Sequence, residues 1–178
     1  MRMILWLMLA VPLFGFTYNQ LQINAQASIF PKLLLLDKHP DTLLVDGKIL
    51  FVIAYEPEDV LTASRLKAQM EQLYPGHIEG YPFEVKTVTF DRIDTSLNAS
   101  ALYVLHSEKS LQTASNVARD KGIVSFVYDI ADLDKGYLFA LTLERRTVIY
   151  LNRAMLPRYG ITFADPLYQI VRFVDEGS

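Results

Sequence analysis

The chain contains no cysteine among its 178 residues. This absence excludes disulfides, a thiol nucleophile and cysteine-ligated zinc or iron–sulfur centres, and redox roles are excluded with them. Histidine is also scarce. The three imidazoles, at His39, His77 and His106, are far apart in the sequence, and no two have the i, i+4 spacing of a helical metal site. The sequence therefore predicts neither a metal nor another cofactor.

Long runs of basic residues are missing as well. The chain has 17 lysines and arginines against 20 aspartates and glutamates, and its formal net charge is -3. A surface that neutralises nucleic-acid phosphates is therefore not expected. No glycine-rich phosphate loop follows the first predicted strand, where Glu56 and Glu58 would repel an anion. Nucleotide binding is not expected either.

The motifs of nucleophilic catalysis are absent too. No Gly-x-Ser-x-Gly sequence surrounds Ser107, and its neighbour His106 would point to the opposite side of an extended segment. We therefore expect a protein that is not an enzyme. A hydrolase that depends on Ser107 is the weakest of three functional hypotheses.

The longest uncharged apolar run lies at the amino terminus. It extends from Met3 to Phe16 after Arg2, and the chain turns polar at residues 17–20. A membrane-spanning helix needs about 20 apolar residues, so we interpret residues 1–16 as a cleaved export signal and residues 17–178 as one domain. The mature chain would start near Phe16 and reside in the periplasm of a Gram-negative cell. Retention of the segment as an amino-terminal anchor is the alternative.

The remaining chain has enough apolar residues for one well-packed domain, since 51% of all residues are hydrophobic and 12% aromatic. Hydrophobic spacing predicts helices and strands in alternation. The predicted helices cover 21–37 with a kink at Pro31, 57–75, 107–121, 153–159 and 165–174. The predicted strands cover 49–54, 83–90, 101–105, 123–127, 137–143 and 148–151.

The order of these elements predicts the fold class. Strands joined by helices require crossover connections, which give a largely parallel sheet with helices on both faces. The last two strands surround the short turn 144–147 and should form an antiparallel hairpin. We therefore predict a three-layer α/β fold with flavodoxin-like topology or that of one lobe of a periplasmic binding protein.

Polar residues follow three of the predicted strands where each strand ends. In an open α/β sheet, ligands bind beyond the carboxyl ends of the strands, so these side chains should converge on one small polar pocket. The alternative is that they only form turns, with Ser107 capping the next helix. The six predicted ligand-binding residues are Tyr55, Glu56, His106, Ser107, Tyr128 and Asp129.

Two segments are candidate contacts for a partner protein. The leucine run 33–36, represented by Leu33 and Leu35, is too long for one buried helical stripe and could form an exposed apolar patch. The alternative interpretation is that this run is a fully buried segment of the core. Arg145 and Arg146 at the predicted hairpin tip suit an acidic partner surface, and their alternative is a solvated turn.

The carboxyl half resembles a known family in its succession of apolar strands, a helix and glycine-hydrophobic pairs. The matching segments are 101–105, 122–127, 148–152 ending in Asn152, Gly160-Ile161, and Pro166-Leu167 with Ile170. On these residues the chain is similar to the YfiR-like family of small exported bacterial signalling regulators. Two features depart from that family: His39-Pro40-Asp41 replaces an aromatic Trp-Pro element, and the cysteines of the founding member are missing.

The resemblance implies a non-catalytic periplasmic regulator. Its partner would be the extracytoplasmic domain of a membrane-bound sensor kinase or diguanylate cyclase, with a small ligand gating the contact. Homodimerisation is left open. The main alternative is a small-molecule solute-binding component of a transport system.

Overall fold

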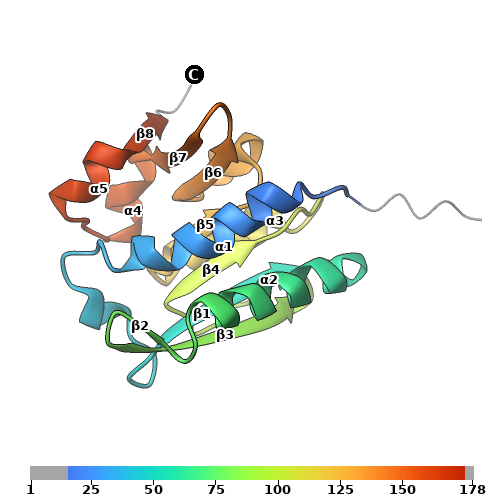
Figure 1. Ribbon diagram of the computed structural model, residues 1–178, viewed down its shortest axis with the longest axis horizontal. Coiled ribbons are helices and arrows are strands. Elements are labelled where there is room, and N and C mark those ends of the chain that lie inside the picture. The colour runs from blue at the N-terminus through green and yellow to red at the C-terminus, as the bar shows by residue number, and fades with distance from the viewer. Residues whose placement is uncertain (1–15, 175–178) are drawn as a thin grey trace, which may run out of the picture.

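The computed structural model describes residues 16–174, which form a single eight-stranded sheet with helices packed against it (Figure 1). The order of the strands across the sheet is β2-β3-β1-β4-β5-β6-β7-β8. The strands are β1 Ile49–Tyr55, β2 His77–Ile78, β3 Tyr81–Thr89, β4 Ala101–Val104, β5 Val124–Val127, β6 Phe139–Leu143, β7 Thr147–Asn152 and β8 Val171–Val174.

The central five strands are parallel, in the order β3-β1-β4-β5-β6. β2 is antiparallel to β3, and β7 is antiparallel to β6 in the predicted hairpin. β1, with all residues from Ile49 to Ala54 buried, lies between β3 and β4 as its continuous apolar run requires. The predicted α/β fold with a largely parallel sheet is confirmed.

Helices cover both faces of the sheet. The helices are α1 Gln20–Leu34, α2 Val60–Leu73, α3 Leu111–Asp120, α4 Leu156–Tyr159 and α5 Asp165–Ile170. α1 and α2 pack together on one face, with α2 against β1 and β3 and α1 against β6 (Figure 1). α3 packs against β4, β5 and α4. The crossovers from β1 to β3 and from β4 to β5 run across the sheet in opposite directions, and right-handed crossovers of opposite direction place their helices, here α2 and α3, on opposite faces.

Five 3-10 turns complete the described part of the chain. They are η1 Pro40–Leu43, η2 Pro57–Asp59, η3 Phe90–Arg92, η4 Ile130–Lys135 and η5 Arg153–Met155. Two of them begin predicted helices: η2 leads directly into α2, and η5 into α4. η4 follows β5, and at its start the Asp129 carboxylate accepts a hydrogen bond from the Ala131 backbone N–H at 3.0 Å.

The prediction for the last element was wrong over residues 171–174. The helix ends at Ile170, and Val171–Val174 forms β8, a strand parallel to β7. The residue pattern of 171–174 is compatible with a helix or with a strand. The strand forms because its backbone pairs with the open edge of β7. The prediction for the first helix also needs correction, because α1 continues through Pro31 and ends at Leu34 rather than at residue 37.

The leucine run is not an exposed patch. Leu33 and Leu34 are 2% and 0% exposed, and Leu35 and Leu36 are half-buried against the core. The exposed-patch interpretation of Leu33 and Leu35 was therefore wrong. The run is covered because α1 packs against both α2 and the sheet, so more than one stripe of the helix is buried.

Candidate functional site

The chain reverses its direction of winding between β1 and β4. From β1 it crosses to β3 on one side, and from β3 it returns to β4 on the other side of β1. The two loops that leave the carboxyl ends of β1 and β4 therefore diverge, which leaves a crevice between them. Ligands of open α/β proteins bind in crevices of this kind.

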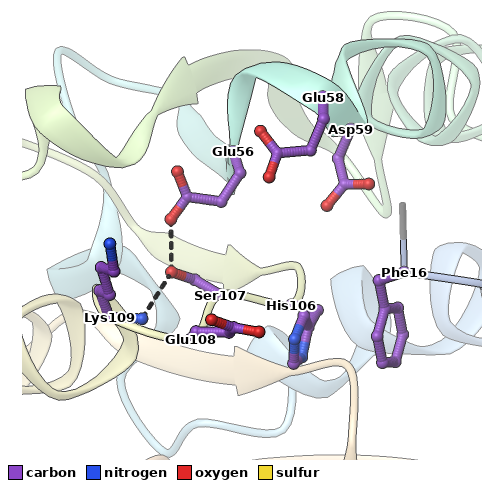
Figure 2. A pocket seen from close by; sticks show the side chains of 8 residues that line it. All are labelled: Phe16, Glu56, Glu58, Asp59, His106, Ser107, Glu108 and Lys109. Carbon is purple, nitrogen blue, oxygen red and sulfur yellow. Dashed lines mark hydrogen bonds between the residues drawn. The ribbon is translucent and has the colours of Figure 1, made fainter. Parts of the chain in front are cut away.

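A cavity of about 370 Å³ lies at this point (Figure 2). The loop after β1 contributes three carboxylates to it, and the loop after β4 contributes an imidazole, a hydroxyl, a fourth carboxylate and an ammonium group. Phe16, from the segment before α1, closes one side. The lining residues are Phe16, Glu56, Glu58, Asp59, His106, Ser107, Glu108 and Lys109.

Glu56 and Ser107 join the two loops across the floor of the cavity. The Ser107 hydroxyl donates a hydrogen bond to Glu56 Oε1, and the Ser110 hydroxyl donates to the same oxygen at 3.2 Å. Ser107 Oγ in turn accepts from the backbone N–H groups of Lys109 at 3.3 Å and Ser110 at 3.0 Å. Ser107 therefore organises the turn before α3. It is not the cap of this helix, because the N-cap position is Ser110.

The hydroxyl of Ser107 is thus bonded to a carboxylate and two amides rather than to an imidazole. Among residues 16–174, no hydrogen bond joins Ser107 to His106. A serine nucleophile needs an adjacent general base that takes its proton. In this arrangement the group that accepts the Ser107 proton in a hydrogen bond is the Glu56 carboxylate and not the His106 imidazole.

Aromatic rings form the wall next to the acidic loop. The Phe16 ring stacks on the His106 imidazole with centroids 4.1 Å apart and an interplanar angle of 13°. Tyr18 and Tyr128 meet edge to face behind this pair at 4.9 Å. The Tyr128 hydroxyl accepts a hydrogen bond from the Asn19 amide at 2.7 Å, which fixes the start of α1. The segment before α1 is therefore part of the site.

Tyr18 connects the aromatic wall to the carboxylates. Its hydroxyl donates to Asp59 Oδ2 at 2.5 Å and accepts from the His106 backbone N–H at 3.1 Å. Burial and the bond to Asp59 raise the pKa of Tyr18. Burial also raises the pKa of Asp59, which is 7% exposed, and the charge of Glu58 adds to that rise while the Tyr18 hydrogen bond opposes it.

The raised pKa of Asp59 predicts a pH-dependent stability. The folded chain takes up a proton on Asp59 at a higher pH than the unfolded chain, so ionised Asp59 costs stability above its raised pKa, and this cost is lost as the pH falls toward the ordinary value of 3.8. We expect Asp59→Asn, whose amide oxygen still accepts from Tyr18, to raise the Tm at pH 7 more than at pH 4. Thermal unfolding at both pH values measures the difference.

Asp134→Asn, at an exposed residue of η4, is the matched control and should shift the Tm little at either pH. A larger stabilisation by Asp59→Asn at pH 4 than at pH 7 would contradict the assigned direction.

The structure brings together half of the predicted ligand-binding residues. Glu56, His106 and Ser107 line the cavity, as their positions at strand ends predicted. Tyr128 is 5% exposed and lies behind Phe16 and Tyr18, so it supports the wall rather than lining the cavity. Tyr55, the last residue of β1, and Asp129, the cap of η4, are not among the lining residues, which corrects their predicted role.

Several lining residues were not predicted. Phe16 was assigned to the end of the export signal, but in the folded chain it packs on His106. Glu58 was considered only as part of the second predicted helix and as a charge that repels anions, and Asp59 only as part of that helix. Both could have been predicted from the sequence. They lie in the turn that directly follows a buried strand, and side chains in such a turn emerge at the carboxyl edge of the sheet. The unpredicted lining residues are Phe16, Glu58, Asp59, Glu108 and Lys109.

A second cavity of about 530 Å³ adjoins the first and shares Glu56 and Lys109 with it. It lies between the end of β3 and the start of α3, where Thr89, Phe90 and Thr113 are among its lining residues. Together the two cavities extend the crevice along the carboxyl edge of the sheet.

Over residues 16–174, no three carboxylate or imidazole groups converge closely enough to hold a metal ion. The four carboxylates of the first cavity come from two facing loops and point to different parts of it (Figure 2). The helices of this part of the chain are all too short or too polar to cross a lipid bilayer.

The two arginines of the hairpin lie where they were predicted. Arg145 and Arg146 are exposed in the turn between β6 and β7. In the order of strands across the sheet, this hairpin is separated from β1 by β4 and β5. They do not belong to the cavity at the β1 and β4 loops.

Comparison with known proteins identifies the fold. No family model and no curated protein sequence matches the chain. A solved conserved-domain protein from Vibrio cholerae O1 biovar El Tor is similar in structure, with a TM-score of 0.59 and 9% identity over 86% of this chain and 60% of that one. An ABC domain from Streptococcus pneumonia, solved in complex with L-Trp, is similar with a TM-score of 0.55 and 12% identity, over 86% of this chain and 62% of that one.

At such low identity these similarities establish a shared α/β fold. The chain spans about three-fifths of the length of both solved proteins.

Proposed function

We propose that the protein is a non-catalytic regulatory module that binds a small molecule in the cavity between the β1 and β4 loops. The observation that carries this proposal is the cavity of about 370 Å³ at the point where the winding reverses, lined by side chains from two diverging loops. Similarity to the fold of an ABC domain solved with L-Trp supports it.

The lining favours a small organic cation with a flat apolar part. Among the lining residues that the structure describes, the carboxylates of Glu58, Asp59 and Glu108 outnumber the ammonium group of Lys109, so the rim attracts positive charge. The proposal places cleavage of the export signal before Phe16, so that the mature chain keeps this ring. The stacked Phe16 and His106 rings then offer an aromatic surface beside those carboxylates. An amine held by carboxylates with its ring against an aromatic face uses both features.

The regulatory part of the proposal is that ligand binding changes a contact with the extracytoplasmic domain of a membrane-bound signalling protein, a sensor kinase or diguanylate cyclase. The resemblance to the YfiR-like family and the apolar amino-terminal run support this location and partner class. The site is suited to coupling, because three separate segments meet at it: the residues before α1, the loop after β1 and the loop after β4.

Thermal unfolding in the presence of small aromatic amines tests ligand binding. We use tryptamine, phenethylamine and L-tryptophan as probes. A compound at 100 times its Kd stabilises the folded state by about 2.7 kcal/mol, which raises the Tm of a chain of this size by roughly 5 to 10 °C. We expect Phe16→Ala to weaken binding of the best amine by about tenfold, because it removes the stacked ring.

His77→Ala changes an exposed residue of β2 that does not line the cavity. It is the control and should leave the ligand-induced shift unchanged. If no cationic compound stabilises the protein, or if Phe16→Ala and His77→Ala behave alike, the proposed ligand site is wrong.

A second candidate function is the solute-binding component of a transport system, which the similarity to the ABC domain favours. The two functions differ in what the ligand does. A regulator changes its affinity for a signalling partner when the ligand binds, whereas a transport component needs only to capture the ligand and release it to a permease. The affinity for the partner's outer domain, measured with and without the ligand, distinguishes them.

A further inference from the structure

β8 forms one end of the sheet and has an open side. It pairs with β7 from Val171 to Val174, and no described residue pairs with its other edge. An edge strand presents backbone N–H and C=O groups that can bond another extended chain. In Figure 1, β8 lies beside α5 at the opposite end of the molecule from β3.

Apolar side chains surround this edge. Ile170 and Phe173 are 55% and 37% exposed, although both are large and hydrophobic. Phe173 stacks with the Tyr168 ring at 6.1 Å, and these two rings line a hollow of about 400 Å³ with Leu156 and Arg153. One apolar side chain of a bound segment would be accommodated there.

The edge is also rich in arginine. Arg146 and Arg172 line a second hollow of about 450 Å³ at the start of β8. Arg153 lies over the Phe173 ring at 5.1 Å, and Arg145 is exposed in the adjacent turn. Glu144 is an acidic neighbour of this group, and it pairs with Arg172 at 3.4 Å. The excess of positive charge is local, since the whole chain is acidic.

We propose that the edge of β8 is a docking strand for an extended, acidic segment of a partner protein. The segment adds its backbone to the sheet, inserts an apolar side chain into the hollow at Phe173, and places carboxylates against Arg146 and Arg172. Charge favours a partner protein over a second copy of this chain. In a symmetric dimer the arginines beside β8 of one copy would face the same arginines of the other, whereas an acidic segment neutralises their charge. This inference rests on one part of the proposed function, which is that the protein binds a partner. It does not depend on the ligand cavity.

The test uses the full chain and two synthetic eight-residue peptides. One alternates glutamate with valine and phenylalanine, and the other has lysine in place of each glutamate. We expect the acidic peptide to shift the backbone amide NMR signals of residues 171–174 and to slow their hydrogen exchange, with an affinity that falls as salt is added. The lysine peptide should bind at least tenfold more weakly.

Two variants test the arginines. Arg146→Glu should weaken binding of the acidic peptide about fivefold, and Arg172→Gln should weaken it similarly. Arg92→Glu, the same kind of change at an exposed residue of η3, is the matched control and should have no effect. Circular dichroism establishes that each variant is folded.

Three results would overturn the proposal: equal binding of the two peptides, signal changes confined to other strands, or protection of residues 171–174 in a concentration-dependent dimer without peptide. The last result would assign the edge to a second copy. The amine titration measures binding in the cavity, and the peptide titration measures binding at β8. A failure of the proposed ligand site is therefore distinguishable from a failure of the proposed docking strand.

Discussion

Replacing Phe126 by alanine is expected to lower the free energy of unfolding by about 3 to 5 kcal/mol, as for other fully buried aromatic residues. Phe126 is 0% exposed and lies at the centre of an aromatic stack in the core. Its ring contacts Phe30 at 4.5 Å, Phe51 at 5.8 Å and Phe139 at 5.3 Å between centroids. The substitution therefore leaves a cavity between α1 and three strands of the sheet, which neighbouring rings cannot fill without moving.

Urea unfolding followed by circular dichroism measures this effect. Phe126→Leu, which keeps most of the apolar volume, should cost about 1 to 2 kcal/mol. The matched control is Phe173→Ala at the exposed sheet edge, which should cost about 1 kcal/mol or less. Equal losses for Phe126→Ala and Phe173→Ala would show that the ring stack is not the centre of the core.

Replacing Gln26 by leucine is expected to cost about 2 to 4 kcal/mol, because it leaves several buried polar groups without partners. Gln26 is 0% exposed on α1. Its amide nitrogen donates to the carbonyl oxygens of Tyr128 at 2.9 Å and Leu141 at 3.0 Å. Its amide oxygen accepts from the Tyr103 hydroxyl at 2.5 Å. One side chain thus ties α1 to strands β4 and β6 and to the segment after β5.

The matched control is Gln22→Leu, the same substitution about one helical turn earlier. Gln22 donates to the same Tyr128 carbonyl at 3.0 Å but is only half-buried, so its loss should cost less than about 1 kcal/mol. A double-mutant cycle with Tyr103→Phe isolates the buried hydroxyl. The double variant should be less destabilised than the sum of the two single variants, because the phenylalanine ring has no hydroxyl that needs an acceptor.

If Gln26→Leu is as stable as the original chain, the buried amide is not the connection that holds α1 on the sheet. The consequence reaches the candidate site, since Tyr128 also fixes the start of α1 through the Asn19 amide, at 2.7 Å from its hydroxyl. Loss of the Gln26 hydrogen bonds should therefore lower both the stability of the chain and its affinity for the amine. Thermal-shift titration of the Gln26→Leu variant with the amine measures the affinity.

Prediction from sequence was accurate where local pattern carries the information. The run Ile49 to Ala54 reads as a strand buried on both faces, and it is one. The strands on either side of the turn 144–147 form the expected hairpin. Glu56, His106 and Ser107 line the cavity because residues that follow parallel strands emerge at one edge whatever the details of packing.

Prediction failed where distant segments decide. Val171–Val174 is a strand because β7 offers it an edge, a fact that no local periodicity contains. Leu33 is buried because α1 lies against both α2 and the sheet. Phe16 joins the site only because the segment before α1 ends beside the loop that carries His106.

Residue composition and spacing were enough to predict the class of fold, the lack of thiol chemistry and three of the side chains at the carboxyl edge. Those properties follow from composition and from hydrophobic period, which are local along the chain. Three other features became visible only in the folded chain: which strand ends face one another, which carboxylate accepts the Tyr18 hydrogen bond, and which edge of the sheet stays open. These depend on contacts between residues tens of positions apart, whose free energies are set only when the whole sheet and both helical layers are assembled.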